Sequence, residues 1–432
     1  MKSLKSASSS VVGDRRTYSA VRDQELQSVA DGLLLTDCDL QTTGSLRKKS
    51  VAERHEKPAC FKAEQKSEMR FWHNSCRSAA IVSLPLPIQL SCMLRPHQTI
   101  FTEGGATMNT IGFVISHKNN ERRRALLPEH LSKIRHVEQL CFESGYGDAI
   151  HQPDAAYAAA GAHIVSRAQA LECDVICDVK LGDADFLSDV APGKLLFGWA
   201  HAVQNTRFTD QAMRGGHTVL AWEEIYEGSR YLFYRNREIA GSAAILQAFL
   251  YCGRLPNDAL VAIYGNGHTA KGALRILHGL GAEVDVYKWR QMEEFRRNIG
   301  RYDVLVNCCM WDTSRSDRLL YRSDLARMKR GAMIIDVSCD PELEIETSHP
   351  TTIDDPVYTV DHVLHYAVDN TPAMFPISVS KMLAKKVSAL VDSVVEGNLF
   401  EMLQRAIVIR NGHIVDPRIT EFRRARGLAC EP

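Results

Sequence analysis

Short apolar runs alternate along the chain from Met108 onward with longer stretches in which apolar residues recur at helical spacing. Helix-like stretches such as Gly272–Gly279 and Leu320–Lys329 lie between the apolar runs. The apolar runs predict strands over Ile111–Ser116, Val175–Val179, Leu260–Tyr264, Val284–Tyr287, Val304–Asn307 and Met333–Val337. Alternation of strands and helices with short connections predicts an α/β architecture built on parallel sheets.

One longer amphipathic stretch lies near the C-terminus. The segment Lys381–Arg405 predicts a single long helix, whose apolar face we expect to pack on a core. The apolar positions are Met382, Leu383, Val387, Leu390, Val394 and Val395.

Residues 1–107 have a different character, rich in Ser, Lys and Arg and without clear periodicity. The simplest interpretation is a disordered tail. A second hypothesis is that this leader is not native and that Met108 is the true start. Glu103-Gly-Gly can be encoded by a purine run that pairs with bacterial ribosomal RNA, and only Ala106 and Thr107 separate it from Met108.

Composition excludes several classes of function. The chain has 432 residues and equal numbers of basic and acidic side chains, 52 each, so it carries no electrostatic footprint for nucleic acid or an anionic membrane surface. Mean hydropathy is −0.20. The best apolar run, Ala79–Leu94, is shorter than the ~18 residues of a membrane span and contains Pro85 and Pro87. We expect a soluble protein without nucleic-acid or membrane partners.

Cysteine usage and the N-terminus favour a reducing, cytoplasmic location. The opening MKSLKSASSS has no apolar core and is not a secretory signal. Several of the twelve cysteines lie in apolar runs, where a free thiol behaves as a small buried side chain: Cys173, Cys177, Cys308, Cys309 and Cys339.

A zinc site is the alternative use of the remaining cysteines. Cys60, His73, Cys76 and Cys92 are close in sequence, but only His73 and Cys76 have a ligand-like gap. We therefore predict no metal site.

The strongest local motif is Gly265-Asn-Gly267-His-Thr-Ala270, which follows an apolar strand directly and opens a helix. In this context Gly265 makes the tight turn and Gly267 lets the backbone approach a diphosphate at the helix N-terminus. Ala270 permits close packing of helix on strand. The motif predicts a dinucleotide site, the alternative being a turn that serves only chain reversal.

The end of the following strand decides which dinucleotide is expected. An NAD site places an acidic residue there, but this chain has Lys288, with Arg290 close behind and Asp285 further back in the strand. Cations attract a ribose 2′-phosphate, so NADPH is predicted over NADH. Both cations could instead be solvated surface groups. Asn307, which closes the next strand, completes the candidate cofactor-binding residues.

Three polar positions lie in apolar company outside the nucleotide motif: Arg123 after the first strand, Lys180 after Val175–Val179, and His201 in Gly198-Trp-Ala-His. Each has an ordinary alternative, respectively a solvated face, a strand-end charge and a core histidine. The carboxyl ends of strands are where open α/β sheets bind ligands, and Lys and His together suit a keto acid.

These motifs, taken in order, resemble the alanine dehydrogenase superfamily, which includes transhydrogenase and saccharopine dehydrogenase. Within it the chain is most similar to the carboxyethylornithine synthases. The resemblance runs from Met108 to about Asn370 and rests on Ser116-His-Lys, Arg123-Arg-Ala-Leu-Leu-Pro, Gly198-Trp-Ala-His201-Ala-Val-Gln-Asn205, Trp311-Asp-Thr-Ser-Arg, Asp336-Val-Ser-Cys-Asp340 and Val360-Asp-His-Val-Leu-His-Tyr.

The resemblance implies roles for individual residues. Arg123 matches an arginine that binds the substrate carboxylate, Lys180 the lysine beside the keto group, and His201 the acid/base histidine. Asp340 matches an aspartate near the nicotinamide, and Asn370 a further active-site asparagine. The chain departs from alanine dehydrogenases at Leu181-Gly-Asp183, where they have Glu-Pro, and at Lys288, where they have Asp.

The resemblance also implies an activity, NADPH-dependent condensation of pyruvate with the side-chain amine of L-ornithine or lysine. Glu223 and Glu224 are further candidates for the α-ammonium of the amino acid, or else a solvated helix start. The alternatives are an amino-acid dehydrogenase that uses ammonia, and a catalytically silent NADP(H) sensor.

The fold implied is two Rossmann-like, doubly wound parallel-sheet domains separated by a cleft. Residues 108–237 are expected to form the first part of the substrate domain and 238–370 the nucleotide domain. Residues 371–432 return to the substrate domain, which is therefore discontinuous. The family also implies a homo-oligomer.

Overall fold

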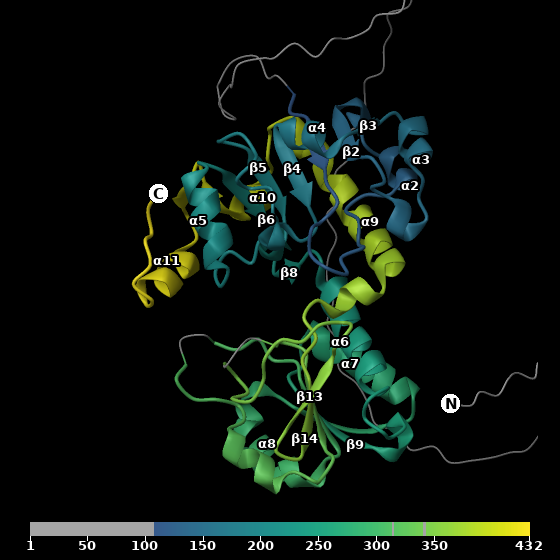
Figure 1. Cartoon of the computed structure of the whole chain (residues 1–432), viewed down its shortest axis with the longest axis vertical. Helices are drawn as coiled ribbons and strands as arrows, with labels where there is room; N and C mark the ends of the chain where they lie inside the picture. The colour runs from purple at the N-terminus through teal and green to yellow at the C-terminus, as the bar shows by residue number, and fades with distance from the viewer. Residues whose placement is uncertain (1–107, 313–314, 340–342) are drawn as a thin grey trace, which may run out of the picture. The chain divides into compact units, whose positions relative to one another are not determined.

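A computed structural model describes residues 108–312, 315–339 and 343–432 (Figure 1). The described residues form two large β-sheets and one small hairpin. The leader lies outside the described residues, and Met108, its proposed boundary, is the first residue that the structure describes. The candidate zinc ligands also lie outside the described residues: Cys60, His73, Cys76 and Cys92.

The first sheet has eight strands in the order β16-β15-β6-β5-β4-β1-β2-β3. Strands β1 to β6 pair in parallel, whereas β15 runs antiparallel to β6 and β16 antiparallel to β15. The strands are β1 (Ile111–Phe113), β2 (Leu140–Glu143), β3 (His163–Val165), β4 (Val175–Asp178), β5 (Leu195–Gly198), β6 (Thr218–Ala221), β15 (Ile407–Arg410) and β16 (His413–Ile414).

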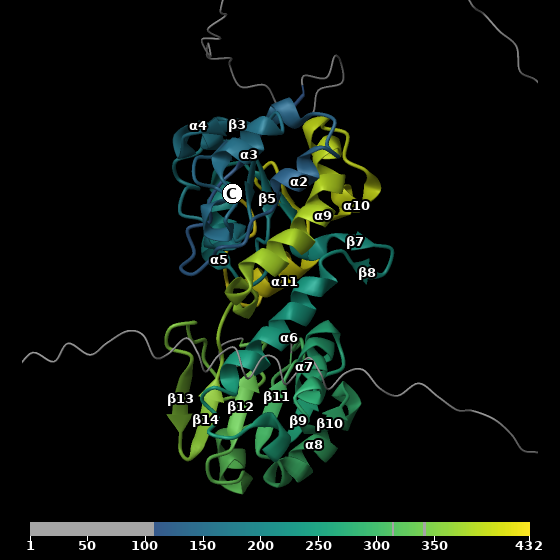
Figure 2. The same cartoon turned by 90° about the vertical axis from the view of Figure 1, so that its right-hand side faces the viewer.

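The second sheet has six strands in the order β10-β9-β11-β12-β14-β13, which lie side by side in Figure 2. All pairings are parallel except the edge pair β13–β14. The strands are β9 (Leu260–Tyr264), β10 (Glu283–Tyr287), β11 (Val304–Asn307), β12 (Met333–Asp336), β13 (Val357–Val360) and β14 (Val363–Tyr366). A small hairpin of β7 (Tyr226–Glu227) and β8 (Arg230–Tyr231) stands apart from both sheets. Two mainly parallel sheets confirm the predicted α/β fold class.

Helices connect these strands and cover the sheets. Those before the second sheet are α2 (Pro128–Leu131), α3 (Asp154–Ala159), α4 (Arg167–Glu172), α5 (Thr206–Arg214) and α6 (Tyr234–Ala248). Those that follow are α7 (His268–Gly279), α8 (Met292–Asn298), α9 (Pro376–Val395), α10 (Glu401–Arg405) and α11 (Pro417–Arg424).

The chain returns to the first sheet after it has completed the second. Leu383, Val387 and Val394 of α9 are fully buried in the same apolar cluster as Ile111 of β1 and Val175 of β4. Strand β15 then pairs with β6. The discontinuous arrangement is therefore confirmed, and the apolar face predicted for the C-terminal helix packs as expected.

The helix expected over Lys381–Arg405 is wrong in its extent. It begins at Pro376 and ends at Val395, and a second helix runs over Glu401–Arg405. Gly397 has φ +65°, a left-handed conformation that ends a helix. The Ser393 hydroxyl, which donates to the Asn398 carbonyl at 2.6 Å, stabilises this turn.

Other expected boundaries differ more modestly. Leu320–Lys329 contains only a 3-10 helix over Arg322–Arg327, and the first strand ends at Phe113 rather than Ser116. Cys173, Cys177 and Cys308 are buried thiols as predicted, but Cys309 and Cys339 are only half-buried. Within the described ranges, no helix combines the length and apolar character that crossing a bilayer requires.

Candidate functional site

The glycine-rich turn leads from β9 into α7. Gly265 has φ +115°, and a side chain there would bring its Cβ to 2.8 Å from the Cys308 carbonyl oxygen. Gly267 is the N-cap of α7, with an ordinary φ of −75° and no described protein atom within 4 Å of a Cβ placed on it. Ala270 is buried one turn into the helix. The turn thus leaves open space in front of a helix N-terminus, which is what a dinucleotide diphosphate needs.

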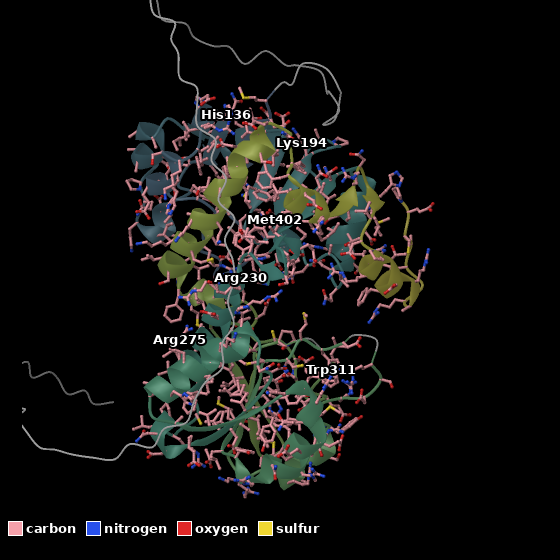
Figure 3. All side chains as sticks on the ribbon, turned by 180° about the vertical axis from the view of Figure 1, so that it is seen from behind. His136, Lys194, Arg230, Arg275, Trp311 and Met402 are labelled. Atoms are coloured by element: carbon pink, nitrogen blue, oxygen red, sulfur yellow. The ribbon has the colours of Figure 1, made fainter. Side chains whose placement is uncertain are left out.

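Helix α6 packs closely against α7 and supports this turn. A Cβ on Gly272 of α7 would lie 1.8 Å from the Glu238 carbonyl oxygen of α6, so only glycine permits this approach. The Glu238 carboxylate interacts with His268, the first residue of α7, at 3.4 Å and with Arg275, labelled in Figure 3, at 3.4 Å. These contacts fix the first turn of α7 relative to α6.

The end of β10 is cationic and open. Lys288 and Arg290 are exposed, and together with Asn266, Trp289 and Gln291 they line an opening of about 500 Å³. Asp285 is turned to another partner, since it accepts a hydrogen bond from the Tyr302 hydroxyl at 2.7 Å.

Asn307 is buried and committed to internal hydrogen bonds. Its Nδ2 donates to Asp336 and to Glu344, both at 2.9 Å, and its Oδ1 accepts the Cys309 backbone N–H at 3.2 Å. The side chain therefore holds the ends of β11 and β12 together and, in this arrangement, is not presented to a ligand.

Arg123 is almost completely buried against Glu121. Its Nε and one terminal nitrogen form a two-pronged ion pair with that carboxylate, at 2.8 and 2.5 Å. The same nitrogen donates to Asn370 Oδ1 at 2.6 Å, and the other terminal nitrogen donates to Asn236 of α6 at 3.2 Å. These bonds use four of the five guanidinium hydrogens, so a substrate carboxylate has to displace one of the present partners to gain a two-pronged grip.

Lys180 and His201 lie in a network of charges that sequence analysis did not foresee. Lys180 Nζ is 3.5 Å from Asp183, and Lys118 Nζ is 3.3 Å from Asp183 and 2.5 Å from Asp369. Burial alone would raise the pKa of Asp369, but the Lys180 and Lys118 ammonium groups lower it. Lys118, Asp183 and Asp369 are thus residues of this site that were missed, although Lys118 and Asp183 stand within motifs already singled out.

His201 has an unusual backbone that Glu223 supports. Its φ of +48° is rare for a side-chain-bearing residue. The Glu223 carboxylate accepts the backbone N–H groups of Ala200, at 3.2 Å, and His201, at 2.5 Å. Burial raises the pKa of Glu223 to about 7. The Glu223 carboxylate is therefore already hydrogen-bonded to the backbone. The Glu224 carboxylate is paired with Arg418 at 2.7 Å. In this arrangement both carboxylates have protein partners at the positions where the α-ammonium of an amino acid was expected.

The imidazole of His201 is held neutral. Neighbouring protein atoms that displace water, and then the Lys180 ammonium, lower the pKa of His201, although the residue is exposed to solvent. A neutral imidazole has one nitrogen lone pair that can accept a proton. Lys180 and His201 therefore offer a cation beside a base.

Residues 369 and 370 bring the predicted side chains together. Asp369 pairs with Lys118, the Lys180 charge helps to lower the pKa of Asp369, and the adjacent Asn370 binds Arg123. Helix α6 links this group to the glycine turn, because Asn236 contacts Arg123 and Glu238, two residues later, contacts His268. Asp340 lies outside the described residues. In the part of the chain that is described, no group of three or more His, Cys, Asp or Glu residues is placed to hold a metal ion.

Comparison with known proteins shows which family the chain resembles. The family model "Alanine dehydrogenase/PNT, N-terminal domain" matches residues 115–233, and "Alanine dehydrogenase/PNT, C-terminal domain" matches residues 288–418. The N(5)-(carboxyethyl)ornithine synthase of Lactococcus lactis is 30% identical over 294 residues, covering 64% of this chain and 94% of that protein. The alanine dehydrogenase of Mycobacterium tuberculosis is 27% identical over 304 residues, covering 62% and 82% respectively.

Solved structures share the fold. An L-alanine dehydrogenase superposes with a TM-score of 0.61 at 22% identity, covering 74% of this chain and all of that chain. A transhydrogenase from Sinorhizobium meliloti gives 0.60 at 21% identity, covering 71% and 99%. With two mainly parallel sheets, a glycine turn and two family models matched in order, the chain belongs to the alanine dehydrogenase/PNT family of oxidoreductases.

Proposed function

We propose that the protein catalyses the NADPH-dependent condensation of pyruvate with the side-chain amine of L-ornithine, or less readily of lysine. The observation that carries the proposal is the group of ion pairs formed by Lys180, Lys118, Asp183 and Asp369, with His201 near enough for the Lys180 charge to lower its pKa. The 30% identity to a protein named N(5)-(carboxyethyl)ornithine synthase, over 94% of its length, supports this choice of substrates.

The residues divide the chemistry between them. Lys180 donates to the keto oxygen of pyruvate and stabilises the negative charge that develops there as the amine adds. The His201 imidazole accepts a proton from the amine as it adds to the keto carbon. It returns this proton to the carbinolamine hydroxyl, which then leaves as water, and the imine is formed. Arg123 and Asn370 hold the pyruvate carboxylate after partial exchange of their present hydrogen bonds.

The nicotinamide cofactor supplies the hydride that reduces the imine to a secondary amine. The residues present suit this cofactor, because Gly267 leaves open space before α7. Gly265 and Ala270 shape the turn, and Lys288 and Arg290 provide cations at the end of β10 for a 2′-phosphate. Asp340 remains a candidate partner of the amine or iminium charge.

The test is a substrate panel with product identification. Purified protein, pyruvate and either NADPH or NADH are mixed with ornithine, lysine or ammonium, and loss of reduced-nicotinamide absorbance is followed. We expect oxidation with ornithine and NADPH, and a product mass equal to ornithine plus pyruvate, less water, plus two hydrogens. Oxidation with ammonium alone, giving alanine, contradicts the proposal in favour of an amino-acid dehydrogenase. Absence of oxidation with every amine favours the NADP(H) sensor. We also expect a homo-oligomer, which size-exclusion chromatography with light scattering measures.

A further inference from the structure

Four charged side chains alternate in sign across the site. Asp369 pairs with Lys118 at 2.5 Å, Lys118 with Asp183 Oδ1 at 3.3 Å, and Asp183 Oδ2 with Lys180 at 3.5 Å. Asp183 therefore lies between the two lysines and offers one oxygen to each. The group as a whole carries no net charge.

Exposure changes along this series. The Lys180 side chain is 10% exposed, whereas those of Lys118, Asp183 and Asp369 are 20%, 36% and 41% exposed. Lys180 is thus the most enclosed of the four side chains, whereas His201 is exposed to solvent. Lys118, Asp183 and Asp369 are therefore more accessible than Lys180 to a substrate that enters from solvent.

The series is poorly explained as a structural feature. Ion pairs exposed to this extent contribute about 0–1 kcal/mol to stability. Pyruvate requires cations but no carboxylate, and ammonia requires no cation. An alternating series of ammonium and carboxylate groups is instead complementary to a molecule that carries both charges side by side, namely the head group of an α-amino acid.

We propose that Lys118, Asp183 and Asp369 recognise the head group of the amino acid that supplies the amine. The α-carboxylate binds Lys118, and the α-ammonium binds between Asp183 and Asp369. This inference rests on the proposed function and adds to it the residues that select an amino acid over ammonia. Binding exchanges the existing ion pairs for equivalent ones with the ligand, so no charge is left buried without a partner.

The dimensions agree with a diamino acid. Bonds of about 1.5 Å allow the side-chain nitrogen of ornithine to reach roughly 5–6 Å from its α-carbon. Within this series, the Asp183 carboxylate lies between Lys118 and Lys180 and contacts both. We therefore expect an ornithine bound at Lys118 by its head group to place its side-chain amine at a keto carbon beside Lys180 and His201.

The experiment compares three amines with different head groups. L-ornithine has both charges, δ-aminovalerate lacks the α-ammonium, and putrescine lacks the carboxylate. For Asp183→Asn we expect the KM of ornithine to rise by about 10- to 100-fold, the loss expected for one hydrogen bond to a charged group, while the KM of δ-aminovalerate stays constant. For Lys118→Met we expect a rise for ornithine and δ-aminovalerate but not for putrescine.

Controls separate recognition from general damage. Asp189→Asn changes an exposed acidic residue that follows Asp183 in sequence. We expect this variant to have the wild-type KM for each of the three amines. Melting temperature, the KM of pyruvate and the Kd of NADPH are measured for every variant. Should Asp183→Asn fail to fold, Asp369→Asn tests the same carboxylate site.

The two proposals fail in different ways. If the wild-type enzyme turns over ornithine but Asp183→Asn shows an unchanged KM, or the same rise for ornithine and δ-aminovalerate, the head-group assignment is wrong and the proposed function stands. If the wild-type enzyme uses ammonium and neither diamino acid, both are wrong.

Discussion

The two glycines of the turn before α7 allow the cofactor site to be tested apart from the fold. Gly265→Ala and Gly267→Ala each add one methyl group, two positions apart in the same turn. They differ in what that methyl group meets. At Gly265 it meets the Cys308 carbonyl in a backbone with φ +115°, and at Gly267 it meets open space in a backbone with φ −75°.

The expected magnitudes follow from this difference. An alanine forced into the conformation of Gly265 costs about 1–3 kcal/mol, and the 2.8 Å contact adds to this, so we expect the melting temperature to fall by roughly 2–12 °C. Alanine at Gly267 is unstrained and should change stability by less than about 0.5 kcal/mol. Its methyl group projects where a diphosphate approaches the helix N-terminus, and such overpacking costs about 1–3 kcal/mol, or roughly 5- to 150-fold in the Kd of NADPH.

Two measurements on the same samples check this pair. Thermal unfolding followed by circular dichroism gives the melting temperature, and titration of NADPH fluorescence gives the Kd. The Gly267→Ala variant is its own control for folding, because its melting temperature should match the wild type. Wild-type affinity in that variant would show that no diphosphate approaches this turn, and a wild-type melting temperature for Gly265→Ala would refute the argument from backbone strain.

Three further substitutions test other parts of the structure. His201→Gln should lower kcat by about 10²–10⁴ and leave the Kd of NADPH unchanged, and near-normal turnover would remove His201 from the acid/base role. Lys288→Asp should move the kcat/KM ratio from NADPH towards NADH by about tenfold or more, because the cation facing the 2′-phosphate is replaced by an acceptor for a hydroxyl; an unchanged ratio would refute the ribose assignment. Burial lowers the pKa of His365 to about 4, so the stability it contributes is complete above pH 6.5 and is lost as the pH falls towards 4, by about 3 kcal/mol. His365→Gln should therefore unfold less steeply with acid than the wild type in denaturant titrations across that range, and equal acid sensitivity would contradict the buried, neutral histidine.

The nucleotide-binding half was predictable because its signals are local. The strand Leu260–Tyr264, the turn and the start of α7 are consecutive in sequence, and the positive φ of Gly265 is a requirement of such a tight turn. The break after Val395 was not predicted, since apolar spacing continues across it. There the deciding feature is the left-handed conformation of Gly397, which the periodicity of neighbouring side chains does not reveal.

The charged half of the site was predictable only in part. Lys180 and His201 stand out because each follows a buried strand, but their neighbours come from distant segments. The ion pair of Lys118 with Asp369 spans 251 positions, and the hydrogen bond of Arg123 to Asn370 spans 247. Such contacts depend on where the chain re-enters the first sheet, which a single sequence does not encode as a local pattern.

That re-entry point has a consequence for how the site works. Asp369 and Asn370 follow β14, which is the last strand of the second sheet along the chain. They precede α9, which packs on the first sheet. Asn370 has φ +67°, so the chain turns sharply at the residue that binds both Arg123 and Glu121. The contacts of these two residues with Lys118 and Arg123 therefore join the connection between the sheets to the proposed keto-acid and amine sites. If a substrate binds as proposed, it exchanges some of these same contacts, and we then expect substrate binding and the conformation of the connection to be energetically linked. A substitution such as Asn370→Ala should accordingly change the KM of pyruvate and the protection of the 369–375 backbone from hydrogen exchange together, and a change in one without the other would show that the linkage is absent.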